Sequence, residues 1–194
     1  MIRSFVAVGL PEGVRSRLEQ HGKELKSLGL YGSYPKADSF HLTLKFLGNI
    51  PEQKVDQIGA ALELAVAGIT PFRLEVRGLG AFPNPSSARV VWIGFEQSEP
   101  LSLLQERVEQ ALADLDFPRE ERAFRPHLTL VRLRSRDNLK ALQSYLREVG
   151  PVATAGTVPV DEVVLFRSDL RPDGARYTRL RAAKLPGKLT FSGG

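Results

Sequence analysis

The tetrapeptide His-Leu-Thr-Leu occurs twice in the chain, beginning at His41 and again at His127. The 194 residues contain only three histidines, and two of them lie in these copies. Apolar and polar residues alternate in both copies, which is typical of a β-strand with one buried face. We therefore predict two strands, each with an imidazole and a hydroxyl on the same face: His41 with Thr43, and His127 with Thr129.

Two imidazoles suit a reaction that needs a general base and a general acid together. Free histidine has a pKa of about 6.5, so one ring can be neutral while the other is protonated. Each role is typically worth about 10²–10⁴ in rate. Displacement at phosphorus fits this pair, because one histidine takes a proton from the attacking oxygen while the other protonates the leaving oxygen. Thr43 and Thr129 could donate hydrogen bonds to the phosphate oxygens, and such a site needs no metal.

Other kinds of site have weaker support in the sequence. Zinc usually takes three or four protein ligands, and neither motif contains a cysteine or an acidic residue. There is no nucleophile elbow, no P-loop and no dinucleotide-type glycine pattern. A purely structural role for His41 and His127, as polar residues on strand surfaces, is the alternative that remains. The third histidine, His21, flanks the apolar stripe of a predicted helix, and we expect it on that helix's surface.

The order of predicted elements also repeats, with an offset of 86 residues between the two motifs. A strand, a helix and two strands recur over about residues 40–95 and 126–183. We expect an α+β fold of two similar lobes, with antiparallel sheets, helices outside, an approximate internal two-fold and a cleft between the lobes. The whole chain, 1–194, would form a single bilobal domain.

Period and turn signals place the individual elements. In the first motif strand Phe40, Leu42, Leu44 and Phe46 would point to the core, and Gly48 would end the strand. The remaining expected elements are a first strand at 1–10 in place of a signal peptide, helices beginning near 11, 51, 100 and 139, strands at 72–76, 89–95, 158–166 and 177–183, a turn at 171–174 and a loose tail at 185–194.

Composition limits the class of protein. With 42% hydrophobic and 25% charged residues and no long apolar run, the chain reads as an ordinary soluble protein with no membrane span. It has no cysteine, which excludes disulfides and thiolate chemistry and fits a cytoplasmic location. Residues 117–194 carry 15 Lys+Arg against 8 Asp+Glu, a net charge of +7. This basic part suggests a polyanionic partner such as RNA, although a solvated cationic surface would look the same.

The segments 40–48 and 124–132 resemble the two signature motifs of the two-histidine phosphoesterase superfamily. More narrowly, the chain is similar to the RNA 2',3'-cyclic phosphodiesterases, which were once described as 2'-5' RNA ligases. Further similarity extends over 5–11, 78–83 and 163–168, so the resemblance spans nearly the whole chain.

This resemblance implies metal-independent hydrolysis of 2',3'-cyclic phosphates at RNA 3' ends, giving 2'-phosphates, with no cofactor. It also implies reverse 2'-5' ligation in vitro and a positively charged cleft between antiparallel sheets. His41 would be the acid that protonates O3', and His127 would be the base that activates water. Thr43 and Thr129 would hold the phosphate.

The resemblance also makes Arg132 a phosphate ligand. Strict alternation would put Arg132 on the core face with Leu128. Either the strand bulges or ends there, which is our prediction, or Arg132 is only a charge at the rim of the cleft. Lys45 shares a face with His41 and is a second candidate for the phosphate, with a solvated lysine as the alternative. Arg125 is a candidate for contact with the RNA backbone.

Members of this family often carry a tryptophan shortly before the first motif, where this chain has tyrosines. The single tryptophan, Trp92, lies in a predicted strand, and we expect it in the core. Tyr34 is then our candidate for stacking on a nucleobase, since tyrosine can serve as a stacking platform.

Three other functions remain open at this point. The same chemistry could act on small cyclic nucleotides or on 2'-5' oligoadenylates. A non-catalytic RNA-binding module is the third, although binding alone would not require two titratable histidines. We expect a monomer that acts on RNA 3' ends or other nucleotides ending in a 2',3'-cyclic phosphate.

Overall fold

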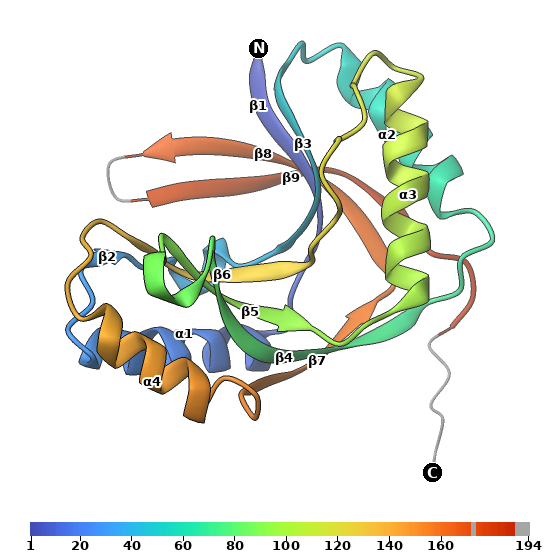
Figure 1. Cartoon of the computed structure of the whole chain (residues 1–194). Helices are drawn as coiled ribbons and strands as arrows, with labels where there is room; N and C mark the ends of the chain where they lie inside the picture. The colour runs from blue at the N-terminus through green and yellow to red at the C-terminus, as the bar shows by residue number, and fades with distance from the viewer. Residues whose placement is uncertain (172–173, 189–194) are drawn as a thin grey trace.

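The computed structural model describes residues 1–171 and 174–188, as fifteen elements (Figure 1). In chain order these are β1 Ile2–Val8, α1 Glu12–Ser27, β2 Gly32–Ser33, η1 Ala37–Ser39, β3 Leu42–Ile50, α2 Lys54–Val66, β4 Phe72–Phe82, η2 Pro85–Ser87, β5 Val90–Phe95, α3 Glu99–Ala113, β6 His127–Leu133, α4 Leu139–Glu148, β7 Thr154–Val160, β8 Glu162–Arg171 and β9 Gly174–Lys184.

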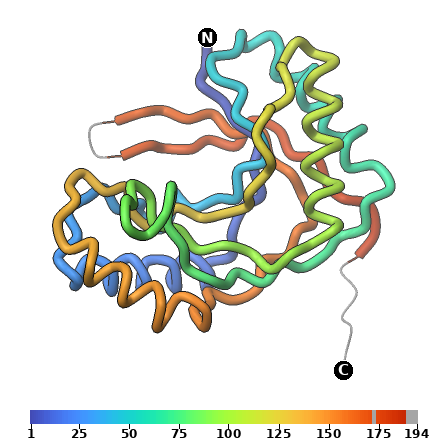
Figure 2. Tube along the Cα trace, in the orientation of Figure 1, coloured from blue at the N-terminus to red at the C-terminus, as the bar shows by residue number. Residues whose placement is uncertain are grey.

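The strands form two antiparallel sheets. Sheet A has the order β3-β1-β8-β9, and sheet B has the order β2-β6-β5-β4-β7. Helices α2 and α3 pack against each other and against β3, β8 and β9, on the outer side of sheet A. Helix α1 packs on β6 and β7 of sheet B, with α4 beside it (Figure 2). The predicted α+β fold, with helices outside two antiparallel sheets, is confirmed.

The two lobes are not the two contiguous repeats that the sequence indicated. Strand β3 lies in sheet A, whereas β4 and β5, which follow it, lie in sheet B. Conversely β6 lies in sheet B, whereas β8 and β9 lie in sheet A. Each half of the chain therefore contributes to both sheets. Because of this interleaving, both halves of the chain are needed to form the cleft between the sheets.

Strand β6 contains the bulge predicted before Arg132. The register with β5 shifts between Val91 and Trp92, which leaves Leu130 as an extra residue. A bulge resets the alternation of side chains. Arg132 is exposed, on the same side as Thr129, instead of being buried among leucines.

Strand β3 has the same bulge at the equivalent position. Its register with β1 shifts between Val6 and Ala7, which leaves Leu44 as the extra residue, 86 positions before Leu130. Our prediction that Phe46 points to the core is therefore wrong. Phe46 is 69% exposed, because the bulge turns it to the other face.

Three further expectations differ from the structure. Strand β3 does not end at Gly48 but continues to Ile50, paired with β1. The run predicted as one strand at 158–166 is two strands, divided at Asp161 between sheets B and A. Most of the predicted tail, residues 189–194, lies outside the described residues, as do residues 172–173 of the predicted turn. Leu185, where the tail was expected to begin, is buried and its N–H donates to Asp161.

A buried ion pair connects β3 to the segment that precedes β6. Lys45 Nζ lies 2.5 Å from Glu109 Oε2 of α3 and donates to the carbonyl of Pro118 at 2.7 Å. The same carboxylate accepts the backbone N–H of Glu120 at 3.2 Å. Residues 118–126, which we call the strap, are thereby fixed to both α3 and β3.

Removal of one partner of this pair leaves the other charge buried and unpaired. We expect Lys45→Met to lower the free energy of unfolding by about 3–5 kcal/mol, measured by urea denaturation. The double variant Lys45→Met with Glu109→Leu should recover much of that loss, because no unpaired charge remains. Equal losses in the single and double variants would show that the pair contributes through packing alone.

Candidate active site

Side chains from both sheets and from the strap line one open cleft. His41 lies directly before β3 and Thr43 lies in that strand of sheet A, whereas His127 and Thr129 lie in β6 of sheet B. The structure thus brings the two predicted pairs, far apart in the sequence, to the walls of a single cavity. Their catalytic roles remain predictions.

The environment of His127 determines which of its nitrogens carries the proton. His127 is the first residue of β6, and its Nδ1 lies 2.7 Å from the carbonyl oxygen of Arg125 in the strap. A carbonyl oxygen can only accept a hydrogen bond, so Nδ1 must be the protonated nitrogen. This leaves the Nε2 lone pair of the neutral ring available as a base. Phe82 meets the ring edge-on, with centroids 5.1 Å apart.

Trp92 is a neighbour of His127 and is only half-buried, not in the core as we predicted. Its ring centroid lies 6.4 Å from that of His127. The indole passes directly over Gly80 of β4, where a Cβ atom would overlap the ring. A glycine is therefore required at position 80 for the indole to reach this place.

The environment of His41 is aromatic. Its ring stacks on Phe5 with centroids 4.4 Å apart, and Tyr177 meets it edge-on at 4.9 Å. Burial lowers the pKa of His41 to about 4, because the imidazolium form is poorly solvated there; the backbone of Ser39 opposes this shift in part. The ordinary pKa near neutrality that we assumed for both histidines is therefore wrong for His41.

The aromatic residues around His41 were not found from the sequence. Phe166 of β8 stacks on Phe5 at 5.4 Å, so three elements besides β3 build this enclosure. Burial raises the pKa of the Tyr177 phenol, whereas the positive charges of Arg132 and Arg3 lower it. The phenol therefore lies within electrostatic range of arginines from both sheets. Tyr177 reaches His41 only because β9 pairs with β8 in one particular register. Local sequence patterns do not reveal that register.

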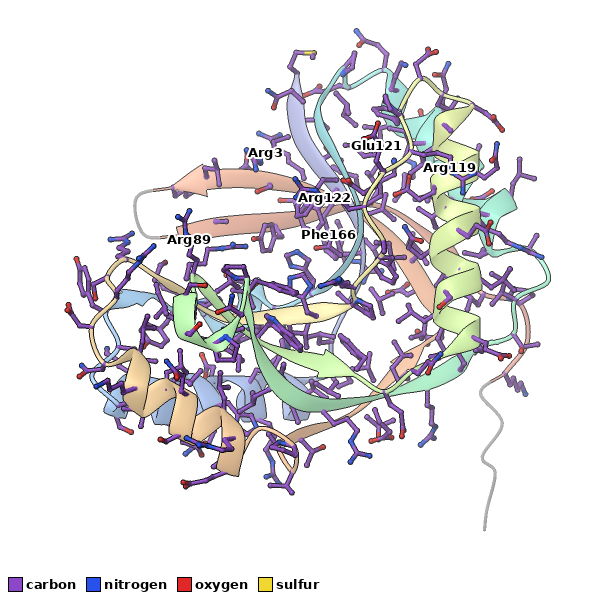
Figure 3. All side chains as sticks on the ribbon, viewed as in Figure 1. Arg3, Arg89, Arg119, Glu121, Arg122 and Phe166 are labelled. Carbon is purple, nitrogen blue, oxygen red and sulfur yellow. The ribbon has the colours of Figure 1, made fainter. Side chains whose placement is uncertain are left out.

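Cationic side chains outnumber acidic ones along the cleft. Arg3 of β1 and Arg122 of the strap both line it (Figure 3). The other lining arginines are Arg119, Arg125 and Arg132, and the strap contributes the lining acids Glu120 and Glu121. Lys45 also borders the cleft, but its charge is compensated by Glu109. An excess of positive charge attracts an anionic substrate.

Two predicted binding residues lie in unexpected surroundings. Lys45 is 6% exposed and is held by the buried ion pair described above, so its ammonium is already occupied. Tyr34 is not among the residues that line the cleft; its ring packs against the core and its hydroxyl donates to the Leu30 carbonyl at 3.0 Å. Our placement of Tyr34 beside the substrate is therefore corrected.

Two features are absent from residues 1–171 and 174–188. No helix there is long and apolar enough to cross a membrane. No group of three or more His, Cys, Asp or Glu side chains is placed to hold a metal ion in that part of the chain.

Comparison with known proteins identifies the family. Residues 14–172 match the model of the 2'-5' RNA ligase superfamily. The chain belongs to this superfamily. An RNA 2',3'-cyclic phosphodiesterase from Methanothermobacter thermautotrophicus is 37% identical over 95% of this chain and 99% of the relative. One of the same name from Thermotoga maritima is 31% identical over 97% of this chain and 98% of its own.

Two solved structures have the same fold as this chain. TT0787 of Thermus thermophilus superposes with a TM-score of 0.76 at 30% identity, covering 97% of this chain and 100% of its own. Escherichia coli LigT complexed with 3'-AMP superposes with a TM-score of 0.75 at 26% identity, covering 96% of this chain and 99% of LigT.

The low pKa of His41 is directly measurable in this 2'-5' RNA ligase superfamily member. We expect the His41 imidazole to titrate near pH 4 in NMR spectra of the free protein. Inorganic phosphate in the cleft should raise that pKa toward neutrality, because an anion stabilises imidazolium. An ordinary pKa of about 6.5 in the free protein would contradict the enclosure described here.

The same shift affects stability. Between about pH 6.5 and pH 4 the unfolded chain binds a proton at His41 that the folded protein does not. The folded state therefore loses stability as the pH falls through this window. Urea denaturation of His41→Gln should show a smaller loss of unfolding free energy than the wild type over the same pH range.

Proposed function

We propose that this protein hydrolyses 2',3'-cyclic phosphates at the 3' ends of RNA, giving 2'-phosphomonoesters and free 3'-hydroxyls, by metal-independent general acid and base catalysis. The observation that carries the proposal is the pairing of two histidines with opposite environments on the walls of one cationic cleft. Membership of the superfamily, and the shared name of the relatives, agree with it.

His127 acts as the base. Its Nε2 removes a proton from a water molecule as the water oxygen attacks phosphorus, and Nδ1 remains hydrogen-bonded to Arg125. The bond from phosphorus to O3' breaks on the opposite side, and His41 transfers its proton to O3'. Negative charge on the non-bridging oxygens is stabilised by Thr43 and Thr129. A 5'-hydroxyl in place of water would give a 2'-5' linkage, the ligase reaction.

The low pKa of His41 suits an acid that acts only when substrate is bound. In the empty cleft near pH 7 the ring is neutral, because its pKa is about 4. A bound phosphodiester brings a negative charge next to it and raises that pKa. The imidazolium formed in this way is a strong proton donor, and Arg132 binds the same phosphate.

RNA is the favoured substrate because arginines continue along the strap, at positions 119, 122 and 125, beyond the two histidines. A small nucleotide is the second candidate, since E. coli LigT has been crystallised with 3'-AMP. The cleft is built from one chain, so we propose a monomer, working on RNA in the cytoplasm.

A short RNA ending in a 2',3'-cyclic phosphate tests the reaction. Incubated with the protein in excess EDTA, it should be converted to a 2'-phosphate end. We expect His41→Ala and His127→Ala each to reduce kcat/KM by about 10²–10⁴, since each removes one proton transfer.

His21→Gln is the matched control for a histidine outside the cleft. Its Nε2 contacts the carbonyl of Thr154 in β7, and the substitution should leave turnover unchanged. Turnover that requires a divalent metal would contradict the mechanism. A 3'-phosphate product would mean that O2' leaves in place of O3'. Turnover of cyclic mononucleotides but not of RNA would favour a small nucleotide as the substrate.

A further inference from the structure

The strap has no backbone–backbone hydrogen bond to the rest of the described structure. Residues 118–126 form no helix or strand, and none of them takes part in such a bond. Two side chains hold the strap backbone instead. Lys45 Nζ donates to the carbonyl of Pro118 at 2.7 Å, and Glu109 Oε2 accepts the N–H of Glu120 at 3.2 Å. The buried ion pair therefore anchors the strap through its main chain.

The other end of the strap determines the state of His127. The carbonyl oxygen of Arg125 lies 2.7 Å from His127 Nδ1 and keeps the proton on that nitrogen. Arg125 follows Glu120 in the same irregular segment, with no helix or strand between them to fix the course of the chain. The position of the Arg125 carbonyl therefore depends on where the strap is anchored.

The remaining contacts of the strap are weaker anchors. Arg119 donates to Gln110 at 3.3 Å, and both side chains are exposed. Phe124 packs against the core but is only half-buried. Contacts between exposed polar side chains contribute little to holding a segment in place. Lys45 and Glu109, in contrast, are 6% and 4% exposed, which makes their contacts the main restraint on the strap backbone.

Stability alone does not explain an ion pair at this place. Two buried charges lose their hydration, and apolar residues of similar volume often stabilise a fold as well or better. A buried pair whose atoms also bond to main-chain groups can instead specify one arrangement of the chain. Here that arrangement is the course of the strap along the cleft.

We propose that Lys45 and Glu109 are positioning residues for His127. They fix the strap so that the Arg125 carbonyl keeps the proton on Nδ1 and leaves Nε2 free to act as the base. This inference rests on the proposed function, in which His127 is the base. With a displaced strap the neutral ring would carry its proton on either nitrogen, and a ring with Nε2–H cannot accept a proton from water. Lys45 thus acts through the strap and not on the phosphate, the role that its place in the first motif suggested.

Two variants separate positioning from stability. In Lys45→Met with Glu109→Leu no buried charge is left unpaired, so the free energy of unfolding should be largely retained, but both hydrogen bonds to the strap backbone are lost. We expect its kcat on the RNA cyclic phosphate to fall about 10²-fold, with KM changed less, because a misplaced base affects the chemical step. In Glu109→Gln the amide oxygen still accepts the Glu120 N–H, and Lys45 keeps its bond to Pro118. This variant should lose stability, because Lys45 has no counter-charge, yet keep a kcat close to that of the wild type.

The tautomer of His127 is a property that a merely structural role would not change. It can be measured in ¹⁵N NMR spectra of the free protein, at a pH where the ring is neutral, because protonated and unprotonated ring nitrogens have different chemical shifts. We expect Nδ1–H and an unprotonated Nε2 in the wild type and in Glu109→Gln. The double variant should show a mixture of the two tautomers.

Lys54→Met is the matched control. Lys54 Nζ also donates to a main-chain carbonyl, that of Leu115 at 3.0 Å, and pairs with an acidic residue, Asp116, at 3.8 Å. These contacts lie ahead of residue 118, outside the strap. Both kcat and the His127 tautomer should therefore stay as in the wild type.

A wild-type tautomer of His127 in the double variant, or a kcat that follows the free energy of unfolding across the two variants, would overturn the proposal. Failure of the wild type to convert the RNA substrate would instead refute the proposed function. The two failures are distinguishable, because the tautomer is measured on the free protein without any substrate.

Discussion

The extra residue in the ladders of β3 and β6 is the constraint on which the cleft depends. A regular strand would place His, Thr and the next alternate residue on one face, and would bury residue 132 among leucines. The bulges at Leu44 and Leu130 change that pattern after the Thr of each motif. The result is a histidine, a threonine and a third cleft-lining side chain on each wall. The third side chain is Phe46 on one wall and Arg132 on the other.

Although the two strands are nearly symmetric, the two histidines have different environments. The residues around each histidine explain the difference. His127 is held by a strap carbonyl that fixes the proton on Nδ1, whereas His41 is enclosed by aromatic rings that disfavour its charged form. The strap is itself fastened by the Lys45–Glu109 pair, next to the first motif. The geometry around His127 therefore depends on Lys45, which lies four positions after His41.

Much of the site could be predicted because it depends on local alternation. The His and Thr of each motif share a face by period two alone, and the bulge before Arg132 follows from the cost of burying an arginine. Phe46 could not be predicted in the same way, because a phenylalanine is stable on a core face and gives no sign of a bulge. Lys45 and Tyr177 depend on partners distant in the sequence: Glu109 on a helix, and the register of β8 with β9. The repeated order of elements in the sequence also does not show that each half of the chain contributes strands to both sheets.

The assignment of His41 as acid and His127 as base is the central claim, and a change of leaving atom tests it most directly. In a cyclic phosphate with sulfur at the bridging 3' position, the departing thiolate needs little protonation. We expect the loss of activity in His41→Ala to disappear almost completely with this substrate, while His127→Ala stays as impaired as with the oxygen substrate. Rescue of His127→Ala instead, or rescue of neither variant, would contradict the assignment.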